Sequence, residues 1–358
     1  MSEEKILEIL SQIQDPFLKN DLVSLGFVKS ISLNGNKLSL ELGSATGNND
    51  KTDSDIRNAF KNKYPDTEIS SIIFTRGIST HINPKKNEIF PDVKNTVAIS
   101  SGKGGVGKST IAANLAAAFA QKGFKTGLID ADIYGPSIPL MFGINEKPKV
   151  REVNGKNKLL PVEKYGVKIM SIGFLIDVNS AVVWRGPMAS SALRQFISDV
   201  IWGELDVLFF DMPPGTGDIQ LTLSQTVPLT GAVIVTTPQE ISLADARKGY
   251  FMFEKVNVPT LGIIENMSYY QLPGGDKEYI FGKEGGRLMA SEFKTKLLGE
   301  IPVNTKIRTA GDEGKPVVIN NPGLTESDIF NRISDELIIE INIVNADRTE
   351  NSDLVIEI

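Results

Sequence analysis

Cysteine is absent from the 358-residue sequence, and histidine occurs once, as His81. Without a thiol, the chain can form no disulfide, no thiolate metal site and no cysteine nucleophile of its own. A single histidine also excludes a metal site built from several imidazoles. Because the sequence offers His81 no evident partner, we expect it to be an exposed linker residue rather than a catalytic one.

Long apolar runs and an excess of positive charge are missing as well. No run of about 18 apolar residues occurs, so the sequence predicts no membrane span. The acidic tail at 342–358 would be repelled by anionic lipid, so we expect no membrane partner. The formal net charge is −6, which argues against a surface devoted mainly to nucleic acid. The N-terminal residues 1–5 are acidic and precede no apolar signal core, so we expect a cytoplasmic protein.

The most informative stretch is a glycine-rich loop, SSGKGGVGKST, at residues 100–110. It follows an apolar run at 96–99 that predicts a buried strand and precedes a helical pattern at 111–119. In that context glycine N–H groups and a helix N-terminus create a site for phosphate. We therefore predict that a nucleotide is bound by Gly102, Lys103, Gly104, Gly105, Val106, Gly107, Lys108, Ser109 and Thr110.

Three aspartates lie where predicted strands end. Asp130 ends the strand at 125–130 and is followed by Asp132, and Asp211 ends a buried strand at 205–211. The carboxyl ends of parallel strands face the crevice in which ligands bind. One carboxylate of the 130/132 pair can orient an attacking water while the other holds Mg²⁺ through water. The predicted metal ligands are Ser109, Asp130 and Asp211.

A proline- and glycine-rich loop follows Asp211 directly, at residues 212–218. Such a loop has defined hinge points and suits a switch that senses the outermost phosphate of a nucleotide. Gly215 is the residue whose backbone N–H can approach that phosphate.

The remaining pattern predicts two domains and a tail. Residues 1–80 read as helix, hairpin, helix and strand, a small α+β domain, and a polar linker follows at 81–95. From 96 to 341 strands alternate with helices, which predicts an α/β domain with a doubly wound, mostly parallel sheet. A polar excursion at 144–166 predicts a short hairpin, and residues 342–358 form an acidic tail.

Several motifs together resemble one group of ATPases. Lys103 adds a second lysine to the loop, a form that resembles the deviant Walker A ATPases. The stretches DADIYGPS at 130–137 and WRGPM at 184–188 narrow the resemblance to the Mrp/ApbC iron–sulfur cluster carrier family. Asp15-Pro16 and the stretch LVSLG at 22–26 look like the MIP18-like domain often fused to these P-loop NTPases. The resemblance spans nearly the whole chain.

This resemblance implies a Mg²⁺-dependent ATPase that acts in iron–sulfur cluster assembly or transfer as a homodimer. It implies that Lys103 reaches the nucleotide of the partner subunit and that Asp132 is placed for hydrolysis, so Lys103, Lys108 and Asp132 form the predicted catalytic set. It also implies that Asn266 contacts the adenine and that Pro302 lies near the base. Without the resemblance, an Asn at a strand end predicts a turn, and Arg185 predicts either a phosphate contact or a surface ion pair.

The sequence departs from this family at two places where the family carries cysteine, and the first is the loop after the hairpin, residues 43–50, which contains none. At the second place, the family carries a Cys-x-x-Cys pair after the strand at 261–267, and here Leu272 and Gly275 stand at those positions. Neither residue can ligate iron, so the cluster that the family leads one to expect has no evident ligands in this chain.

Two hypotheses therefore stay open. In one, the ATPase still works in iron–sulfur assembly, with assembly proteins or apo-protein clients that supply cysteines. In the other, it is a nucleotide-switched dimeric scaffold that recruits proteins without carrying metal. A DNA-partition switch ranks third, and it predicts salt-sensitive DNA binding.

Overall fold

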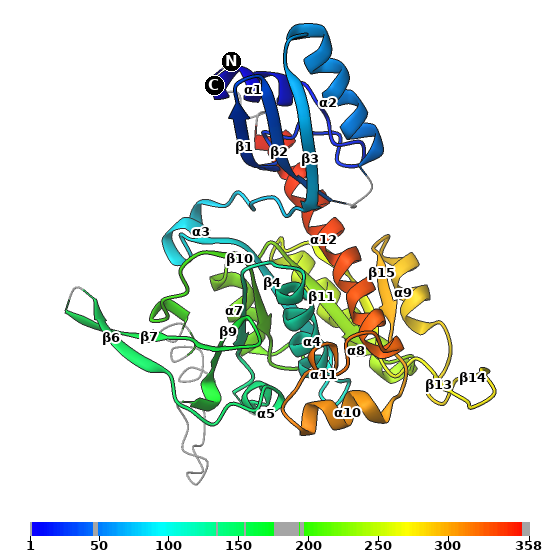
Figure 1. The fold of residues 1–358 in the computed structure, drawn as a ribbon. Helices are drawn as coiled ribbons and strands as arrows, with labels where there is room; N and C mark the ends of the chain where they lie inside the picture. Colours follow the sequence, from blue (N-terminus) through cyan, green and yellow to red (C-terminus); the bar gives the residue numbers. More distant parts are fainter. Residues whose placement is uncertain are drawn as a thin grey trace, which may run out of the picture. The chain divides into compact units, whose positions relative to one another are not determined.

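The computed structural model describes residues 2–45, 49–133, 135–153, 155–174, 193 and 197–352, with residues 84, 87 and 348–352 described by their backbone alone. The chain divides into two compact units, Met1–Ile82 with Ile338–Ile358, and Asn83–Leu337. Figure 1 colours both along the sequence. Tyr134, the WRGPM stretch at 184–188 with its Arg185, and the tail after Ser352 lie outside the described residues.

The first unit contains a three-stranded sheet in the order β1-β2-β3. The predicted hairpin is antiparallel β1–β2, turning at Gly35 with a positive φ of 66°, and β3 runs parallel to β2. Buried residues of the two helices, such as Leu10 and Phe60, pack with Leu40 in one apolar core. The elements are α1 (Glu3–Leu10), β1 (Val28–Asn34), β2 (Lys37–Ser44), α2 (Asp50–Lys63) and β3 (Glu68–Arg76).

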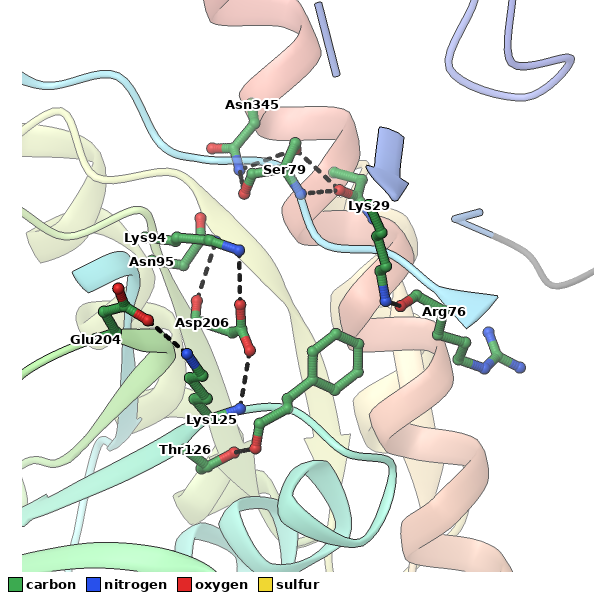
Figure 2. Close-up of polar contacts among 12 residues, drawn as sticks. Lys29, Arg76, Ser79, Lys94, Asn95, Lys125, Thr126, Glu204, Asp206 and Asn345 are labelled. Carbon is green, nitrogen blue, oxygen red and sulfur yellow. Dashed lines mark hydrogen bonds and ion pairs between the residues drawn. The ribbon is translucent and has the colours of Figure 1, made fainter. Parts of the chain in front are cut away.

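The end of the last helix completes this unit, which differs from the predicted separate tail. Helix α12 runs over Thr325–Ser352 and belongs to the first unit from Ile338 onward. The buried Asn342 accepts hydrogen bonds from the backbone N and the Oγ of Ser79, at 2.7 and 2.8 Å. Asn345 donates from Nδ2 to the carbonyl of Ser79 at 3.0 Å, as Figure 2 shows. Residues 342–352 therefore form part of a domain.

The predicted linker at 81–95 is also structured. Helix α3 (Pro84–Ile89) begins behind Asn83, whose side chain accepts from the N–H of Lys85, and β4 already begins at Val93. The expectation of an exposed His81 is wrong, because His81 is buried with Nδ1 3.2 Å from Oδ1 of Asn345. Its polar partner lies 264 residues away in the sequence, which local composition cannot reveal.

The second unit is built on an eight-stranded sheet in the order β15-β12-β11-β4-β10-β5-β9-β8. Neighbouring strands are parallel except β8, which is antiparallel to β9. Strands β4, β5 and β10 are almost wholly buried, as expected for a parallel sheet covered on both faces. The strands are β4 (Val93–Ser101), β5 (Thr126–Asp130), β8 (Val162–Lys164), β9 (Val167–Ser171), β10 (Leu205–Asp211), β11 (Gly231–Thr236), β12 (Thr260–Glu265) and β15 (Leu297–Glu300).

Helices and two small hairpins surround this sheet (Figure 1). The predicted excursion at 144–166 contains the exposed hairpin β6 (Lys149–Val153) and β7 (Lys156–Leu160). Among the described helices, none is both long enough and apolar enough to cross a membrane. The other elements are α4 (Lys108–Gln121), α5 (Ile138–Met141), η1 (Ile172–Phe174), α7 (Asp218–Thr226), α8 (Glu240–Lys255), β13 (Tyr270–Gln271), β14 (Lys277–Glu278), α9 (Gly285–Glu292), α10 (Thr305–Asp312) and α11 (Val317–Asn320).

One carboxylate connects the amino ends of the three central strands. Asp206, on β10, accepts from Nζ of Lys94 on β4 at 2.8 Å and from the backbone N of Lys125, just before β5, at 2.8 Å (Figure 2). Asn95 donates to the backbone carbonyl of Asp206 at 3.3 Å. This polar cluster stabilises the edge of the sheet opposite to the one where the phosphate loop begins.

Candidate functional site

The glycine-rich loop connects the carboxyl end of β4 with the first turn of α4. Gly105 and Gly107 have φ of +83° and +84°, a region that side chains disfavour. A Cβ on Gly102 would lie 2.2 Å from the backbone carbon of Asp245 in α8. Glycine is therefore required at these positions, and the loop places its N–H groups at the N-terminus of a 14-residue helix.

Lys108 lies buried between two of the predicted aspartates. Its Nζ is 2.6 Å from Oδ1 of Asp211 and 3.6 Å from Oδ2 of Asp132, and all three side chains are largely or fully shielded from solvent. Burial raises the pKa of Asp211, and the Lys108 ammonium opposes that effect. The lysine is thus held by carboxylates in a position next to the loop, where a phosphate could replace them.

Asp130 lies beside this group and is fully buried. Its Oδ2 accepts from Ser171 Oγ at 3.0 Å and from the N–H of Ile138 at 3.1 Å. Burial first, and then the neighbouring charge of Asp211, raise the pKa of Asp130 to about 7. Asp130 therefore serves in this arrangement as a hydrogen-bonding support for the segment after β5 as well as a potential source of charge.

The donor set at the loop fits Mg²⁺. Oδ2 of Asp211 and Oδ1 of Asp132 are buried and have no hydrogen-bond partner within the described part of the chain. Such oxygens can accept from the water shell of a hard cation, and the half-buried Ser109 lies in the first turn of α4 nearby. Within the described ranges, no group of three or more His, Cys, Asp and Glu side chains is arranged to hold a metal directly. A cation here would thus depend on water and phosphate oxygens for most of its ligands.

The loop after Asp211 lies against the phosphate loop. The N–H of Gly215, whose φ is +93°, donates to the carbonyl of Ser101 at 2.9 Å. On α7, the buried Gln220 donates from Nε2 to Oγ of Ser100, and its Oε1 has no partner among the described residues. The approach of the Gly215 N–H to a phosphate stays a prediction, since that N–H bonds to Ser101 here. Gln220 and Ser171 were not predicted, because a Gln in a helix and a Ser at a strand end carry no signal that identifies their partners.

A cavity of about 440 Å³ opens beside the loop, and it brings together two predicted base contacts. Asn266 and Pro302 both line it, along with Gly107 of the loop. Asn266 donates from Nδ2 to the carbonyl of Val106 at 2.8 Å, and a Cβ on Gly107 would lie 2.2 Å from that nitrogen. Most of the other lining residues are apolar, which suits a planar heterocycle. Phe281, which also lines the cavity, was not predicted.

The predicted site residues thus gather in two adjoining places. Lys108, Asp132 and Asp211 meet at the phosphate loop with Asp130 beside them, and Asn266 and Pro302 meet at the cavity. Lys103 is half-buried, and its carbonyl accepts from Ser101 Oγ at 2.9 Å. Within the described part of the chain its ammonium makes no ion pair, so it is available to a ligand or a partner.

Comparisons with known families and relatives show what the chain is similar to. Residues 92–338 match the family model described as NUBPL iron-transfer P-loop NTPase, and residues 3–68 match the model of an iron–sulfur cluster assembly protein. An iron–sulfur cluster carrier protein of Helicobacter pylori is 38% identical over 99% of this chain and 97% of its own length. An iron–sulfur protein required for NADH dehydrogenase in Arabidopsis thaliana mitochondria is 51% identical over 69% of this chain and 78% of its own length.

Solved structures show the same fold for the larger unit. A nucleotide-binding protein of Archaeoglobus fulgidus in complex with ADP is 39% identical, with a TM-score of 0.58 over 65% of this chain and 91% of that one. A cell division ATPase, MinD, of Pyrococcus furiosus has a TM-score of 0.50 at 20% identity, over 68% of this chain and 97% of that one. The second likeness concerns the fold alone.

Proposed function

The chain belongs to the NUBPL iron-transfer P-loop NTPase family, and from this premise we propose that it binds and hydrolyses ATP with Mg²⁺ in iron–sulfur cluster assembly or transfer. One observation carries the proposal: a buried lysine at a helix N-terminus, next to a glycine loop, with two carboxylates that each keep an oxygen unpartnered among the described residues. That arrangement suits a triphosphate with its cation. The relatives named for iron–sulfur carriage supply the biological setting.

Lys108 is the residue that must change partners on nucleotide binding. Its ammonium now bonds to Asp211 at 2.6 Å. A triphosphate in the loop offers it several anionic oxygens within reach of the same helix turn, so the lysine can exchange a carboxylate for a phosphate without losing a charge partner. Asp211 would then hold Mg²⁺ through water, with Ser109 as a direct ligand. The cation would neutralise charge on the phosphates.

Asp132 is the residue placed to orient the attacking water. Its Oδ2 lies 3.6 Å from Lys108, and its Oδ1 has no partner among the residues that the structure describes. Asp132 lies two residues after the end of β5 and is slightly exposed, whereas Asp130 is fully buried. Lys103 contributes a second cation for the developing negative charge, either in the same subunit or in the second subunit of a dimer.

The iron–sulfur cluster is cargo in this proposal, and the chain by itself does not fit it. The sequence contains no cysteine, and among the described residues no cluster of potential ligands replaces the thiolates. The segment around Leu272 and Gly275 is an exposed hairpin without any such donor set. A cysteine-bearing assembly protein or client must therefore supply the cluster ligands.

The same absence favours a second candidate function. A protein that switches between nucleotide states and recruits partners without touching the cluster needs the phosphate loop and Asp132 but no thiol. Both hypotheses use the same nucleotide site. They differ in whether the protein acts on an iron–sulfur cluster together with a cysteine-bearing partner or only recruits partner proteins.

Hydrolysis tests the shared part of the proposal. We expect the purified protein to release phosphate from ATP only with Mg²⁺, and Lys108→Ala and Asp132→Ala each to lower the rate by about 100-fold or more. Lys255→Ala is the matched control, since Lys255 is an exposed lysine in the last turn of α8. Equal rates in all four proteins would contradict the assignment of the site.

Reconstitution separates the two candidates. The protein is incubated anaerobically with iron and sulfide, alone and with a cysteine-bearing assembly protein, and bound iron, bound sulfide and ATPase rate are measured. Cluster that is delivered to or released from the assembly protein in an ATP-dependent way supports the carrier. ATP-dependent complex formation without any effect on cluster supports the scaffold.

A further inference from the structure

The exposed hairpin after β12 begins and ends in the wall of the nucleotide-side cavity. We define the hairpin segment as residues 267–282, which contain β13 and β14. Met267, its first residue, and Phe281, near its end, both line the cavity of about 440 Å³, as do Gly107 of the phosphate loop and Asn266. The phosphate loop and both ends of the hairpin segment therefore contribute to the lining of one cavity.

The base of the hairpin segment is firmly attached to the sheet. The N–H of Ser268 donates to Ile301 at 2.9 Å, and the N–H of Val303 donates to Tyr269 at 2.7 Å. Ser268 Oγ also donates to Oε1 of the buried Glu265 at 2.5 Å, and Oε2 of the same carboxylate accepts from the N–H of Gly286. Glu265 thus joins the chain entering the hairpin segment to the helix that follows it.

The outer part of the hairpin segment combines one isolated bridge, from Tyr270 to Val303, with pairing between its own two strands. Strands β13 and β14 contain two residues each, and both are exposed. At the tip, the N–H of Leu272 donates to Asp276 and the N–H of Gly275 donates to Leu272, both at 2.9 Å. A two-stranded hairpin of this size is marginal in water. Its order therefore depends strongly on how firmly its two ends are held in the cavity wall.

Phe281 is the part of that wall that a ligand can reach. Its side chain is half-buried and lines the cavity, whereas its neighbour Ile280 is exposed and does not. An aromatic ring in a mostly apolar cavity beside a phosphate loop offers a stacking face to a nucleobase. The next residue, Gly282, has a φ of +108° and approaches Pro238 closely, so the backbone behind Phe281 is constrained.

We propose that Phe281 contacts the base of the bound nucleotide and that the base, by filling the cavity, orders the hairpin segment. The proposal rests on the proposed nucleotide site. A bound base joins Met267 and Phe281 across the cavity and so restrains both ends of a weak hairpin. The nucleotide state is thereby transmitted to a surface that exposes Tyr270, Leu272 and Ile280.

Two ligands separate the contribution of the base from that of the phosphates. Mg²⁺·ADP carries both, and Mg²⁺·pyrophosphate carries only the phosphates. Calorimetric titration is expected to show that Phe281→Ala weakens ADP binding about tenfold, the loss of one stacking contact, and leaves pyrophosphate binding unchanged. Ile280→Ala, the matched control, is expected to change neither affinity.

Hydrogen exchange of residues 269–282 reports the ordering. ADP is expected to slow exchange in the wild-type protein and in Ile280→Ala, and pyrophosphate is not. In Phe281→Ala, we expect that even saturating ADP does not slow the exchange of these residues. Phe281→Trp keeps an aromatic ring, so it is expected to retain ADP affinity and to show a fluorescence change with ADP but not with pyrophosphate. This variant keeps the test valid if the alanine variant folds poorly.

The outcomes that overturn the inference differ from those that overturn the nucleotide site. Equal losses for ADP and pyrophosphate in Phe281→Ala, or equal protection of the hairpin segment by the two ligands, would overturn the inference and leave the nucleotide site intact. A wild-type protein that binds neither ligand would overturn the nucleotide site, and this inference with it.

Discussion

The central feature at the scale of single residues is a lysine placed among carboxylates. Lys108 compensates the buried charge of Asp211 at 2.6 Å and lies 3.6 Å from Asp132. In water such a pair would contribute little, but here neither partner can be solvated. The same contacts that hold the lysine ready for phosphate therefore also support the nucleotide-free protein.

Removing the lysine should destabilise the nucleotide-free protein. We expect Lys108→Met to lower the free energy of unfolding by about 3 kcal/mol, because Asp211 then remains buried without its cation. The double variant Lys108→Met/Asp211→Asn should recover most of that loss, since an amide carries no charge. Urea denaturation of the three proteins measures both effects. A single variant as stable as the wild type would show that Asp211 is not charged in the folded protein.

The raised pKa of Asp130 predicts a pH-dependent stability. Because the folded-state pKa is about 7 and thus above the unfolded value, the folded protein holds a proton that the unfolded chain has already lost. Stability contributed at this site therefore falls as the pH rises from about 4 to about 7. Between pH 5 and pH 8, the free energy of unfolding of Asp130→Asn should therefore rise by at least about 1 kcal/mol relative to that of the wild type.

Denaturation curves of both proteins at the two pH values test this prediction. The difference in free energy of unfolding between the two proteins is taken at each pH, and the two differences are compared. Any effect of the substitution that does not depend on pH then cancels. A difference that does not vary with pH would mean that Asp130 titrates at its ordinary value in the folded protein.

At the scale of elements, the carboxyl-end edge and the amino-end edge of the large sheet differ in their polar contacts. The carboxyl ends of β4, β5 and β10 carry the phosphate loop, Asp130 and Asp211. The amino ends of the same strands meet at Asp206, which binds Lys94 and the backbone of Lys125. Among the described residues, the first edge has carboxylate oxygens without a hydrogen-bond partner, whereas both carboxylate oxygens of Asp206 at the second edge have partners. This is the pattern expected when function and stability are separated along a strand.

Substitution at the second edge should therefore affect stability alone. We expect Asp206→Ala to lower the free energy of unfolding by about 1–3 kcal/mol, because the N–H of Lys125 loses its acceptor. The ATPase rate at temperatures where the protein stays folded should not change. Glu204→Ala, which removes only an exposed ion pair with Lys125, is the control and should have little effect. A loss of activity without a loss of stability in Asp206→Ala would contradict this separation.

At the scale of the whole molecule, the small unit is not continuous in the sequence. Its sheet and two helices come from residues 1–82, and the end of α12 supplies Asn342 and Asn345. Ile343 of the same helix packs against the apolar core of this unit. The family model matched to residues 3–68 lies within the first of these segments and does not include the C-terminal contribution.

Asn342 tests how far the small unit depends on this helix. It is fully buried and bonds to Ser79 and Gly77 through three hydrogen bonds. We expect Asn342→Ala to lower the free energy of unfolding of the small unit by about 2 kcal/mol, since Ser79 N–H loses its acceptor. Faster hydrogen exchange should be confined to residues 2–80. Arg332→Ala, an exposed change on the same helix, is the control. Unchanged exchange in Asn342→Ala would show that the small unit folds without this contact.

The sequence alone determined the fold class, the phosphate loop and the positions of Lys108, Asp132 and Asp211, because these depend on local patterns. Glycines at positive φ, apolar strands and acidic strand ends are each specified within about ten residues. The tertiary structure decided what depends on distant segments. It buried His81, joined the end of α12 to the small unit, paired Ser171 with Asp130, and placed Phe281 at the cavity beside Gly107. A buried polar or aromatic side chain takes its role from whichever neighbour satisfies it, and that neighbour is chosen by the packing of the whole chain.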